Sequence, residues 1–250
     1  MFYERDYFIH YYDSDLKKQA VIQSLLRFFE DIAILHSEHV KLGIDYYHRH
    51  NVGWVLYKWD IKIIRYPEFK ETVKVRTSAS YLKSFHAYRY FDVLDLNGEQ
   101  IATANSMWLF INPATRKPVY ITEDIFKGYS VDKNKMTHLE FGEINNLKMI
   151  DAQKEFDIRY IDIDTNNHVN NIKYVDWALE LVPVNILREY TLNRLKVNYK
   201  KEISYGKNVI SSINIEDEEE KIKCIHQISS NETLLCQLET NWKHTKNTFT

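Results

Sequence analysis

The 250-residue chain is predicted to adopt an α+β fold of two tandem domains, in each of which a helix is followed by an antiparallel sheet. Three observations support this prediction. A helical pattern followed by strand patterns occurs twice, the two halves align as an internal repeat, and the length allows two ordinary domains. The composition agrees, because 44% apolar residues and only 6 Gly indicate packed cores and argue against disorder.

A long helical pattern opens the first half and runs from Asp15 to Lys41. Its apolar stripe recurs at helical spacing and comprises Leu25, Phe28, Ile32 and Leu35. Gly43 is a candidate C-cap, because glycine accepts the left-handed conformation that ends many helices. Strand patterns follow, separated by turn signals at Tyr66–Pro67, Asn97–Gly98 and Asn112–Pro113, and the Asn-Gly pair predicts a hairpin.

Residues 121–151 have weaker periodicity and many Lys, Asn and Asp residues, which predicts an interdomain linker with short helical pieces. The predicted organisation is therefore an N-terminal domain at residues 1–125, a linker at 126–152 and a C-terminal domain at 153–250.

The second half repeats the order of the first. Alternating side chains predict a strand over Phe156–Ile163, and an apolar helical stripe ends at Pro183. The stripe comprises Ile172, Val175, Leu179 and Val182, and the four strands expected after it are Leu195–Lys201, Asn208–Ile215, Ile222–Ser229 and Leu234–Lys243. The acidic run Glu216–Glu220 is expected to be a solvated turn.

The connection Asp162–Asn171 carries the densest set of polar side chains in the chain. Asp164, Asn166 and His168 alternate along it, so a short extended segment would point all three to one side and make them candidate catalytic residues. A simpler interpretation is helix capping, because Asp and Asn side chains accept the unpaired amide hydrogens of a first helical turn. Capping does not require His168.

A calcium loop is a second alternative for the same connection. Asp162, Asp164 and Asn166 match the first three ligand positions of an EF-hand. However, Asn167 stands where glycine is needed, and Lys173 stands where a bidentate glutamate is needed. No metal site is therefore expected.

The internal repeat aligns this connection with a counterpart near the N-terminus. At an offset of 149 residues, Ile9, Tyr11, Asp13 and Asp15 fall on Ile158, Tyr160, Asp162 and Asp164. At an offset of 136, Ile61, Ile63, Phe69 and Val73 fall on Val197, Tyr199, Tyr205 and Val209. A chance match among common residue types is the alternative. The copies differ in their polar residues: Asn166, Asn167 and His168 correspond to Lys17, Lys18 and Gln19, and Glu202 corresponds to Tyr66.

The second copy resembles the signature of the plant and bacterial acyl-ACP thioesterases. The matching residues are Asp164, Asn166, His168, Val169, Asn170, Asn171, Tyr174 and Trp177, followed by Tyr199, Lys200, Lys201 and Glu202. The resemblance is strong over residues 156–205. Plant members carry a cysteine after the glutamate, whereas Ile203 stands there in this chain. A thiol nucleophile at that position is therefore excluded.

The resemblance implies two hotdog domains, each a long central helix wrapped by an antiparallel sheet. It also implies hydrolysis of fatty acyl-acyl carrier protein thioesters, with the carrier as partner and no cofactor. Because only the second copy keeps the polar set, we expect one active site per chain. The first copy is then a structural and substrate-binding half.

Roles follow for the four candidate catalytic residues as a hypothesis. Glu202 with His168 would activate a water molecule, Asp164 would orient and electrostatically support His168, and Asn166 would hold the carbonyl oxygen or the water. A thiol with a pKa of about 8.5 leaves without a strong acid. The alternative for Glu202 is a strand carboxylate paired with Lys200 or with another basic residue at the surface.

Two other functions stay open: an acyl-CoA thioesterase on the same scaffold, and a non-catalytic acyl or acyl-carrier binding protein. Basic residues around the second copy could steer an acidic carrier or simply be a solvated face. They are Arg188, Arg194, Lys196, Lys200, Lys201 and Lys207. A monomer and a homodimer are both compatible with two hotdog domains in one chain.

The remaining expectations come from composition. A net charge of −2 gives no indication of nucleic-acid binding. No uninterrupted apolar run reaches the length of a membrane span, and the N-terminus lacks the apolar core of a signal peptide, so a cytoplasmic protein without membrane insertion is expected. Cys224 and Cys236 are expected to be reduced, buried thiols on facing hairpin strands.

Overall fold

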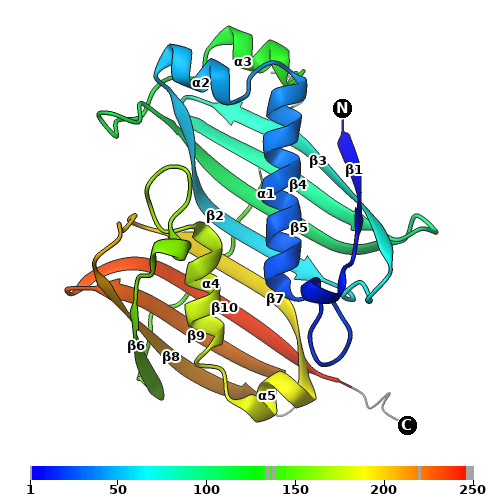
Figure 1. The fold of residues 1–250 in the computed structure, drawn as a ribbon, viewed down its shortest axis with the longest axis vertical. Coiled ribbons are helices and arrows are strands. Elements are labelled where there is room, and N and C mark those ends of the chain that lie inside the picture. The colour runs from blue at the N-terminus through cyan, green and yellow to red at the C-terminus, as the bar shows by residue number, and fades with distance from the viewer. Residues whose placement is uncertain (1, 133–135, 137–138, 219–220, 246–250) are drawn as a thin grey trace. The chain divides into compact units, whose positions relative to one another are not determined.

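The computed structural model describes residues 2–132, 136, 139–218 and 221–245. It divides into two compact units, Met1–Phe141 and Gly142–Thr250. In each unit one helix lies across one face of an antiparallel sheet (Figure 1). The predicted α+β class, with a helix on an antiparallel sheet in each half, is confirmed.

The described strands of the first unit pair antiparallel in the order β1-β3-β4-β5-β2. They are β1 (Tyr3–Phe8), β2 (Gly53–Ile63), β3 (Thr72–Lys83), β4 (His86–Leu94) and β5 (Gln100–Ile111). The helical elements are the 3-10 turn η1 (Tyr11–Asp13), the central helix α1 (Ile22–His39), α2 (Ile44–His50) and α3 (Glu123–Gly128).

The described strands of the second unit pair antiparallel in the order β7-β10-β9-β8-β6. They are β6 (Ala152–Asp157), β7 (Tyr190–Tyr199), β8 (Asn208–Glu218), β9 (Lys221–Ser230) and β10 (Thr233–His244). The helical elements are the 3-10 turn η2 (Tyr160–Asp162), the central helix α4 (Asn171–Leu179) and α5 (Val184–Glu189). The four strands predicted after the helix are all present.

The central helix of the first unit is shorter than its apolar pattern predicts. It begins at Ile22, and the segment predicted as its first two turns instead contains a tight turn in which Lys18 has a φ of 57°. The prediction of a glycine C-cap was wrong. The left-handed residue is Lys41, with a φ of 61°, while Gly43 has a negative φ and is the N-cap of α2.

Three predictions in the second unit also need correction. The strand predicted over Phe156–Ile163 is β6, which ends at Asp157 because the next residues form η2. Pro183 does not end the central helix, which stops at Leu179, but is the N-cap of α5. Within the predicted acidic turn, Glu216 and Asp217 lie in β8, and residues 219–220 lie outside the described part of the chain.

Each core lies between the central helix and the inner face of its sheet. In the first unit, Phe29 of α1 packs between Trp59 and Phe91, with ring centroids 5.8 and 5.1 Å away, and all three side chains are almost fully buried. Each such burial removes enough apolar surface from water to contribute roughly 1.5–3 kcal/mol. In the second unit, Val175 and Trp177 of α4 have the same role.

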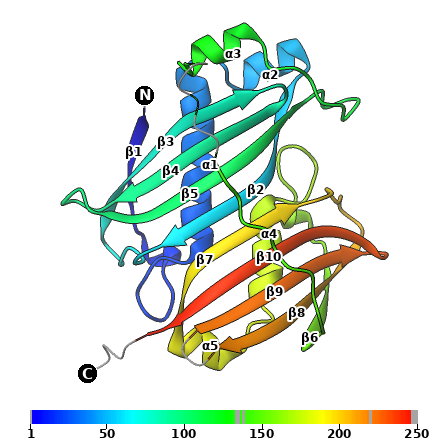
Figure 2. The same ribbon diagram turned by 180° about the vertical axis from the view of Figure 1, so that it is seen from behind.

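Figure 2 shows the opposite faces of the sheets, on which no described helix lies. Residues after α3 contact these faces. In the first unit the Phe141 ring lies 5.8 Å from the Tyr88 ring, and in the second unit Gln237 donates a hydrogen bond to Asn146 at 3.1 Å.

The two cysteines lie on neighbouring strands, and the prediction of buried thiols is confirmed. Cys224 and Cys236 are both free and buried, on β9 and β10. They are not cross-strand neighbours, since Cys224 pairs with Thr240 and Cys236 with Ile228. In the described part of the chain, no helix is both long enough and apolar enough to cross a membrane.

Candidate active site

The candidate catalytic residues of the second unit lie on a tight turn between η2 and α4. Ile163 and Val169 pair as an antiparallel bridge, and the Asp164 amide donates to the His168 carbonyl at 2.8 Å. Asn167 reverses the chain with a φ of 62°, a conformation that asparagine tolerates better than most residues. The prediction of an extended segment with alternating side chains was therefore wrong.

The Asp164 carboxylate holds this turn together. Its Oδ1 accepts the backbone amide of Asn166 at 2.8 Å and that of His168 at 3.4 Å, and Oδ2 lies 3.4 Å from the Asn166 side-chain amide. Such side-chain to backbone bonds are typical of Asx turns. Asp164 therefore contacts the main chain of His168, and this contact fixes the backbone position from which the imidazole extends.

Glu202 reaches the imidazole from the segment that follows β7. The Glu202 Oε2 lies 3.5 Å from His168 Nδ1, and each side chain keeps about a third of its surface exposed, at 34% and 31%. The Val169 amide donates to the Ile203 carbonyl at 3.0 Å, which fixes this segment beside the turn. The structure thus brings together two residues that are far apart in the sequence.

Asn166 lies at the exposed tip of the turn. Its backbone amide is held by Asp164, so its position relative to His168 is set by the same carboxylate. The four predicted site residues therefore share one short segment and one neighbouring loop.

The helix-capping interpretation is correct for a different residue of the motif. The Asn170 side chain accepts the Ile172 amide at 2.9 Å and caps α4. The Tyr199 hydroxyl donates to the Asn171 carbonyl at 3.0 Å and joins the first turn of α4 to the end of β7. These contacts stabilise the base of the turn. His168 takes no part in capping α4.

Asp162 lies beneath the candidate site, and the sequence indicated for it only the rejected role of a calcium ligand. It is fully buried beneath the turn and accepts the Arg159 backbone amide at 2.9 Å and the guanidinium at 2.8 and 3.2 Å. Burial alone would raise the pKa of Asp162, but the hydrogen bonds from Arg159 outweigh burial and leave the pKa below its usual value. Its alignment with Asp13 was the signal in the sequence.

Tyr174 of α4 is buried close enough to the site to sense its charges. It is 2% exposed, and burial raises the pKa of its hydroxyl, as do the nearby charges of Glu202 and Asp164. Its ring packs edge-on against that of Tyr199 at 5.7 Å. A neutral phenol therefore lies within electrostatic reach of both carboxylates.

The first unit repeats the backbone of this turn bond for bond, which confirms the internal repeat. The Asp15 amide donates to the Gln19 carbonyl at 2.9 Å, and the Asp15 carboxylate accepts the amides of Lys17 at 2.8 Å and Gln19 at 3.2 Å. The Ala20 amide donates to the Pro67 carbonyl at 2.8 Å, as Val169 does to Ile203. Both offsets found in the sequence, 149 and 136, therefore hold in three dimensions.

The side chains of the first copy cannot carry out the same chemistry. Gln19 stands in place of His168, and Tyr66 stands in place of Glu202. Burial, and after it the charge of Asp15, raises the pKa of the Tyr66 hydroxyl, which therefore stays protonated. This copy lacks both an imidazole and a carboxylate base at these positions.

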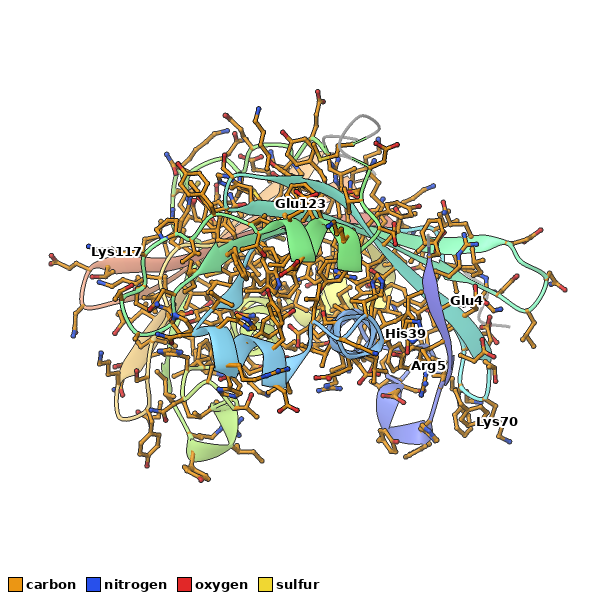
Figure 3. All side chains as sticks on the ribbon, turned by 90° about the horizontal axis from the view of Figure 1, so that it is seen from above. Glu4, Arg5, His39, Lys70, Lys117 and Glu123 are labelled. Atoms are coloured by element: carbon orange, nitrogen blue, oxygen red, sulfur yellow. The ribbon has the colours of Figure 1, made fainter. Side chains whose placement is uncertain are left out.

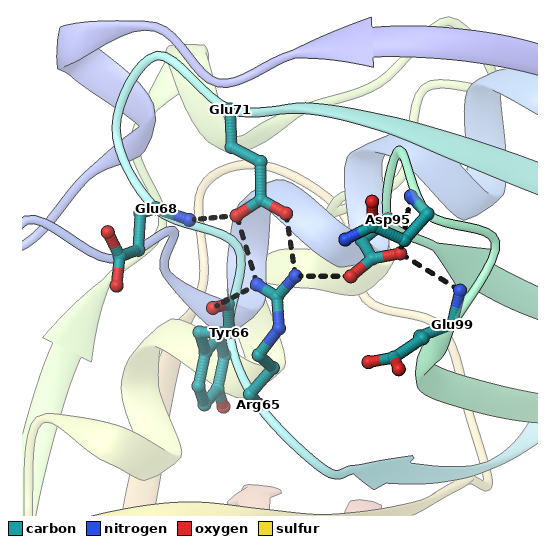
Figure 4. A network of polar contacts seen from close by, with 7 residues as sticks. Arg65, Tyr66, Glu68, Glu71, Asp95 and Glu99 are labelled. Atoms are coloured by element: carbon teal, nitrogen blue, oxygen red, sulfur yellow. Dashed lines mark hydrogen bonds and ion pairs between the residues drawn. The ribbon is translucent and has the colours of Figure 1, made fainter.

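An ion-pair network holds the loop after β2, which carries Tyr66 (Figure 4). Arg65 binds both oxygens of Glu71, at 2.8 and 3.0 Å, and also Asp95 at 3.2 Å. Glu71 accepts the Glu68 amide at 2.8 Å as well. The hydrogen bonds from Arg65 lower the pKa of Glu71 despite its partial burial. The loop is therefore fixed at both ends.

The basic residues proposed for carrier docking differ in availability. Lys196 forms a 2.9 Å ion pair with Glu239, and both side chains are largely buried, so this lysine is not a docking residue. Lys200, Lys201 and Lys207 are exposed. Within the described residues, no three His, Cys, Asp or Glu side chains lie close enough to hold a metal ion.

Two family models match the chain. Residues 1–129 match the acyl-ACP thioesterase N-terminal domain, and residues 146–244 match the acyl-ACP thioesterase C-terminal domain. The oleoyl-acyl carrier protein thioesterase of Coriandrum sativum, named as chloroplastic, is 25% identical over 228 residues, which cover 84% of this chain and 62% of the plant protein. The chain therefore spans about three fifths of that relative's length.

Solved structures agree over nearly the whole chain. A Lactobacillus plantarum protein, provisionally described as an oleoyl thioesterase, superimposes with a TM-score of 0.92 at 26% identity, covering 99% of this chain and 98% of that one. The 12:0-ACP thioesterase of Umbellularia californica gives a TM-score of 0.83 at 20% identity, covering 98% and 94% of the two chains. The fold is the double hotdog.

Proposed function

Because two family models match almost its whole length, this chain belongs to the acyl-ACP thioesterase family, and we propose that it hydrolyses the thioester bond of fatty acyl-acyl carrier protein. The products would be a free fatty acid and the carrier thiol. The observation that carries the proposal is the approach of Glu202 to His168 at 3.5 Å, on a turn whose backbone is fixed by Asp164.

In the proposed mechanism Glu202, aided by His168, acts as a general base on a water molecule. The water oxygen bonds to the thioester carbonyl carbon while its proton passes to the base, and the carbon–sulfur bond then breaks. The thiolate leaves and takes up the proton. In this proposal the Asn166 amide holds the carbonyl oxygen or the water, and Asp164 keeps the turn in position.

Replacing the catalytic residues tests the proposal directly. His168→Ala and Glu202→Gln should each lower kcat for acyl-carrier substrates by about 10²–10⁴-fold, because each removes a proton-transfer group. The matched control is Gln19→Ala, at the position that corresponds to His168 in the first copy. Release of thiol would be followed spectrophotometrically, and turnover near that of the unaltered enzyme in both site variants would refute the mechanism.

An isotope experiment distinguishes a general base from a direct nucleophile. In a single turnover in ¹⁸O-labelled water, a general base gives labelled fatty acid and unlabelled Glu202. A nucleophilic Glu202 would instead form an acyl anhydride, and water attack at its Glu202 carbonyl would give unlabelled product and put the label into the Glu202 carboxylate. Trapping with hydroxylamine during turnover would reveal the anhydride if water attacks the other carbonyl. We expect the first outcome, and mass spectrometry of the product and of the peptide containing Glu202 measures both.

The same proposal assigns different roles to the two units. The second unit would be catalytic, at residues 153–250, and the first, at residues 1–125, would bind substrate, giving one active site per chain. What supports it is the loss of His and Glu at the first copy while its backbone is retained. The carrier, named in the plant relatives, would be the partner. Comparing matched carrier and CoA thioesters separates this function from acyl-CoA hydrolysis.

A further inference from the structure

One tyrosine of the family motif has no role in the proposed mechanism. Tyr199 is the last residue of β7 and stands three residues before Glu202. Its hydroxyl donates to the carbonyl of Asn171, the first residue of α4, which stands three residues after His168. The bond therefore joins the same two segments whose side chains approach to 3.5 Å in the candidate site.

A second bond between these segments belongs to the fold of both units. The Val169 amide donates to the Ile203 carbonyl at 3.0 Å, and the corresponding Ala20 and Pro67 make the same bond at 2.8 Å in the first unit. The first copy makes it without a histidine and a glutamate at the catalytic positions. This bond therefore shapes the turn and is not specific to a catalytic one.

The first unit cannot make the counterpart of the Tyr199 bond. Ile63 corresponds to Tyr199 and Ile22 to Asn171, at the offsets of 136 and 149. Ile63 is buried, and its side chain has no donor. Figure 3, which views the first unit nearly along α1, shows side chains filling the layer between this helix and the sheet. A hydrocarbon side chain is thus sufficient to build the same turn.

The tyrosine bond and the catalytic pair therefore occur in the same copy. The second copy has the hydroxyl donor together with His168 and Glu202, whereas Ile63, Gln19 and Tyr66 stand in these places in the first. If the tyrosine served packing alone, an apolar residue would serve equally well, as it does in the corresponding core of the first unit. Its hydroxyl is then expected to serve the site.

Neighbouring rings hold the Tyr199 side chain in place. Tyr199 is 8% exposed, and the Tyr174 ring of α4 packs edge-on against it with centroids 5.7 Å apart. Trp177 packs edge-on against Tyr174 in turn, at 5.5 Å. In the first copy Leu25 stands in place of Tyr174. The hydroxyl is thus presented to Asn171 by a ring with little freedom to change rotamer.

The position of Glu202 depends on the backbone that carries it. Its side chain keeps 34% of its surface exposed, so packing alone does not fix it beside His168. Proton transfer requires donor and acceptor within about 2.6–3.2 Å, and a displacement of about 1 Å can lower a rate by about 10²-fold. At 3.5 Å the pair lies just outside that range, so a small shift of either segment would separate it further.

We propose that Tyr199 is a positioning residue, whose hydroxyl bond to Asn171 holds the segment of Glu202 at the distance from His168 that proton transfer requires. Tyr199 acts through these segments and contacts neither the water nor the thioester. Its effect on the rate rests on the proposed function, whereas its effect on the separation does not. A tyrosine with a purely structural role would stabilise the second unit and leave the separation unchanged.

Tyr199→Phe tests this role because it removes the donor and keeps the ring. We expect kcat for acyl-carrier substrates to fall about 10–100-fold with KM unchanged, since the substrate still binds but the base is displaced. The matched control is Thr191→Val near the other end of β7, which removes a hydroxyl bonded to Thr245 at 2.9 Å and should leave kcat unchanged. Urea unfolding shows whether both variants are folded under the assay conditions.

A double variant separates positioning from a general loss of stability. If Tyr199 acts through Glu202, adding Tyr199→Phe to Glu202→Gln should cause no further loss of kcat, because the base that it positions is already gone. Additive losses would overturn the role of Tyr199. Turnover of Tyr199→Phe equal to that of the unaltered enzyme, with Glu202→Gln slow, would also overturn it and would leave the proposed hydrolysis standing.

Crystal structures of the unaltered chain and of Tyr199→Phe provide a measurement that needs no substrate. We expect the separation of Glu202 Oε2 from His168 Nδ1 to increase from 3.5 Å by about 1 Å in the variant, while the bond from Val169 to Ile203 is retained. An unchanged separation would overturn the proposal whether or not the chain hydrolyses acyl-carrier thioesters. An unaltered chain without turnover would instead refute the proposed function alone.

Discussion

The identity of a single left-handed residue distinguishes the two turns energetically. Lys18 and Asn167 occupy corresponding positions with φ values of 57° and 62°. A left-handed conformation costs most L residues roughly 1–2 kcal/mol, and less for asparagine, whose short side chain bonds locally. The first copy therefore keeps a lysine at a position where asparagine would be more stable.

Lys18→Asn should accordingly raise the free energy of unfolding by about 0.5–1 kcal/mol. The reverse change, Asn167→Lys, should lower it by a similar amount and serves as the matched control. Urea unfolding with an unchanged slope measures both. A loss of stability in Lys18→Asn would mean that the lysine side chain makes a contribution larger than its backbone strain.

At this scale the sequence predicted candidate site residues that the structure brings together, but it did not predict how they are held. Asp164, His168 and Glu202 were recognisable from motif and repeat. Their bonding was not, because whether a carboxylate accepts a side chain or a main-chain amide depends on backbone angles that no residue type fixes. The structural role of Asp162 was not predicted for the same reason, since its partner Arg159 lies only three residues away, within a turn that was predicted as strand.

The two central helices begin differently. Asn170 caps α4 with its side chain, whereas Val21, at the corresponding position before α1, has no side-chain acceptor. An N-cap side chain satisfies one of the unpaired amides of the first turn and contributes about 1 kcal/mol.

Asn170→Ala should therefore lower the free energy of unfolding by about 1 kcal/mol, and Val21→Asn should raise it by up to about the same amount. Thermal melts followed by circular dichroism would measure both changes. Asn170→Gly is the control, because glycine at an N-cap costs only a few tenths of a kcal/mol relative to asparagine. No gain from Val21→Asn would show that burial of the valine outweighs the missing cap.

At the level of elements, long periodic segments were predictable and short helices were not. The last four strands of the second unit overlap their predicted ranges, because strands of ten to twelve residues are long enough to be recognised, although β7 begins at Tyr190 and not at Leu195. The helices α2 and α5, at seven and six residues, are too short to show a clear period.

For the whole molecule, the two-domain arrangement followed from the sequence because duplication leaves a signal that spans every element. Predicting the hotdog fold required the family resemblance. Periodicity predicts a helix and a sheet, but it does not predict that the sheet wraps around the helix. Strand order, with the first strand of each unit beside a later one, likewise depends on long-range pairing.

Each unit buries one neutral histidine, and this makes the fold acid-sensitive. Burial lowers the pKa of His226 to about 3, and burial with the adjacent Arg89 lowers that of His36 to about 3. Between the unfolded pKa of about 6.5 and these values, the unfolded chain binds protons that the folded chain does not. Folding stability is therefore complete above pH 6.5 and decreases as the pH falls.

The expected slope is about 1.4 kcal/mol per pH unit for each histidine below pH 6. His226→Gln should flatten the pH dependence of unfolding by that amount while the remaining slope from His36 persists. Thermal midpoints measured between roughly pH 7 and 4 would show this. An unchanged slope in His226→Gln would mean that His226 is already protonated in the folded protein.

The turn that both units share is shaped by main-chain hydrogen bonds and by one aspartate. The side chains at its tip contribute little to that shape. After a duplication, the residues at the tip of such a turn can be substituted while the turn still folds. One copy can then keep a reaction while the other is free to acquire an unrelated use. The same property makes the first copy a site for redesign, where Gln19→His with Tyr66→Glu would ask whether a second reaction centre can be restored in one chain.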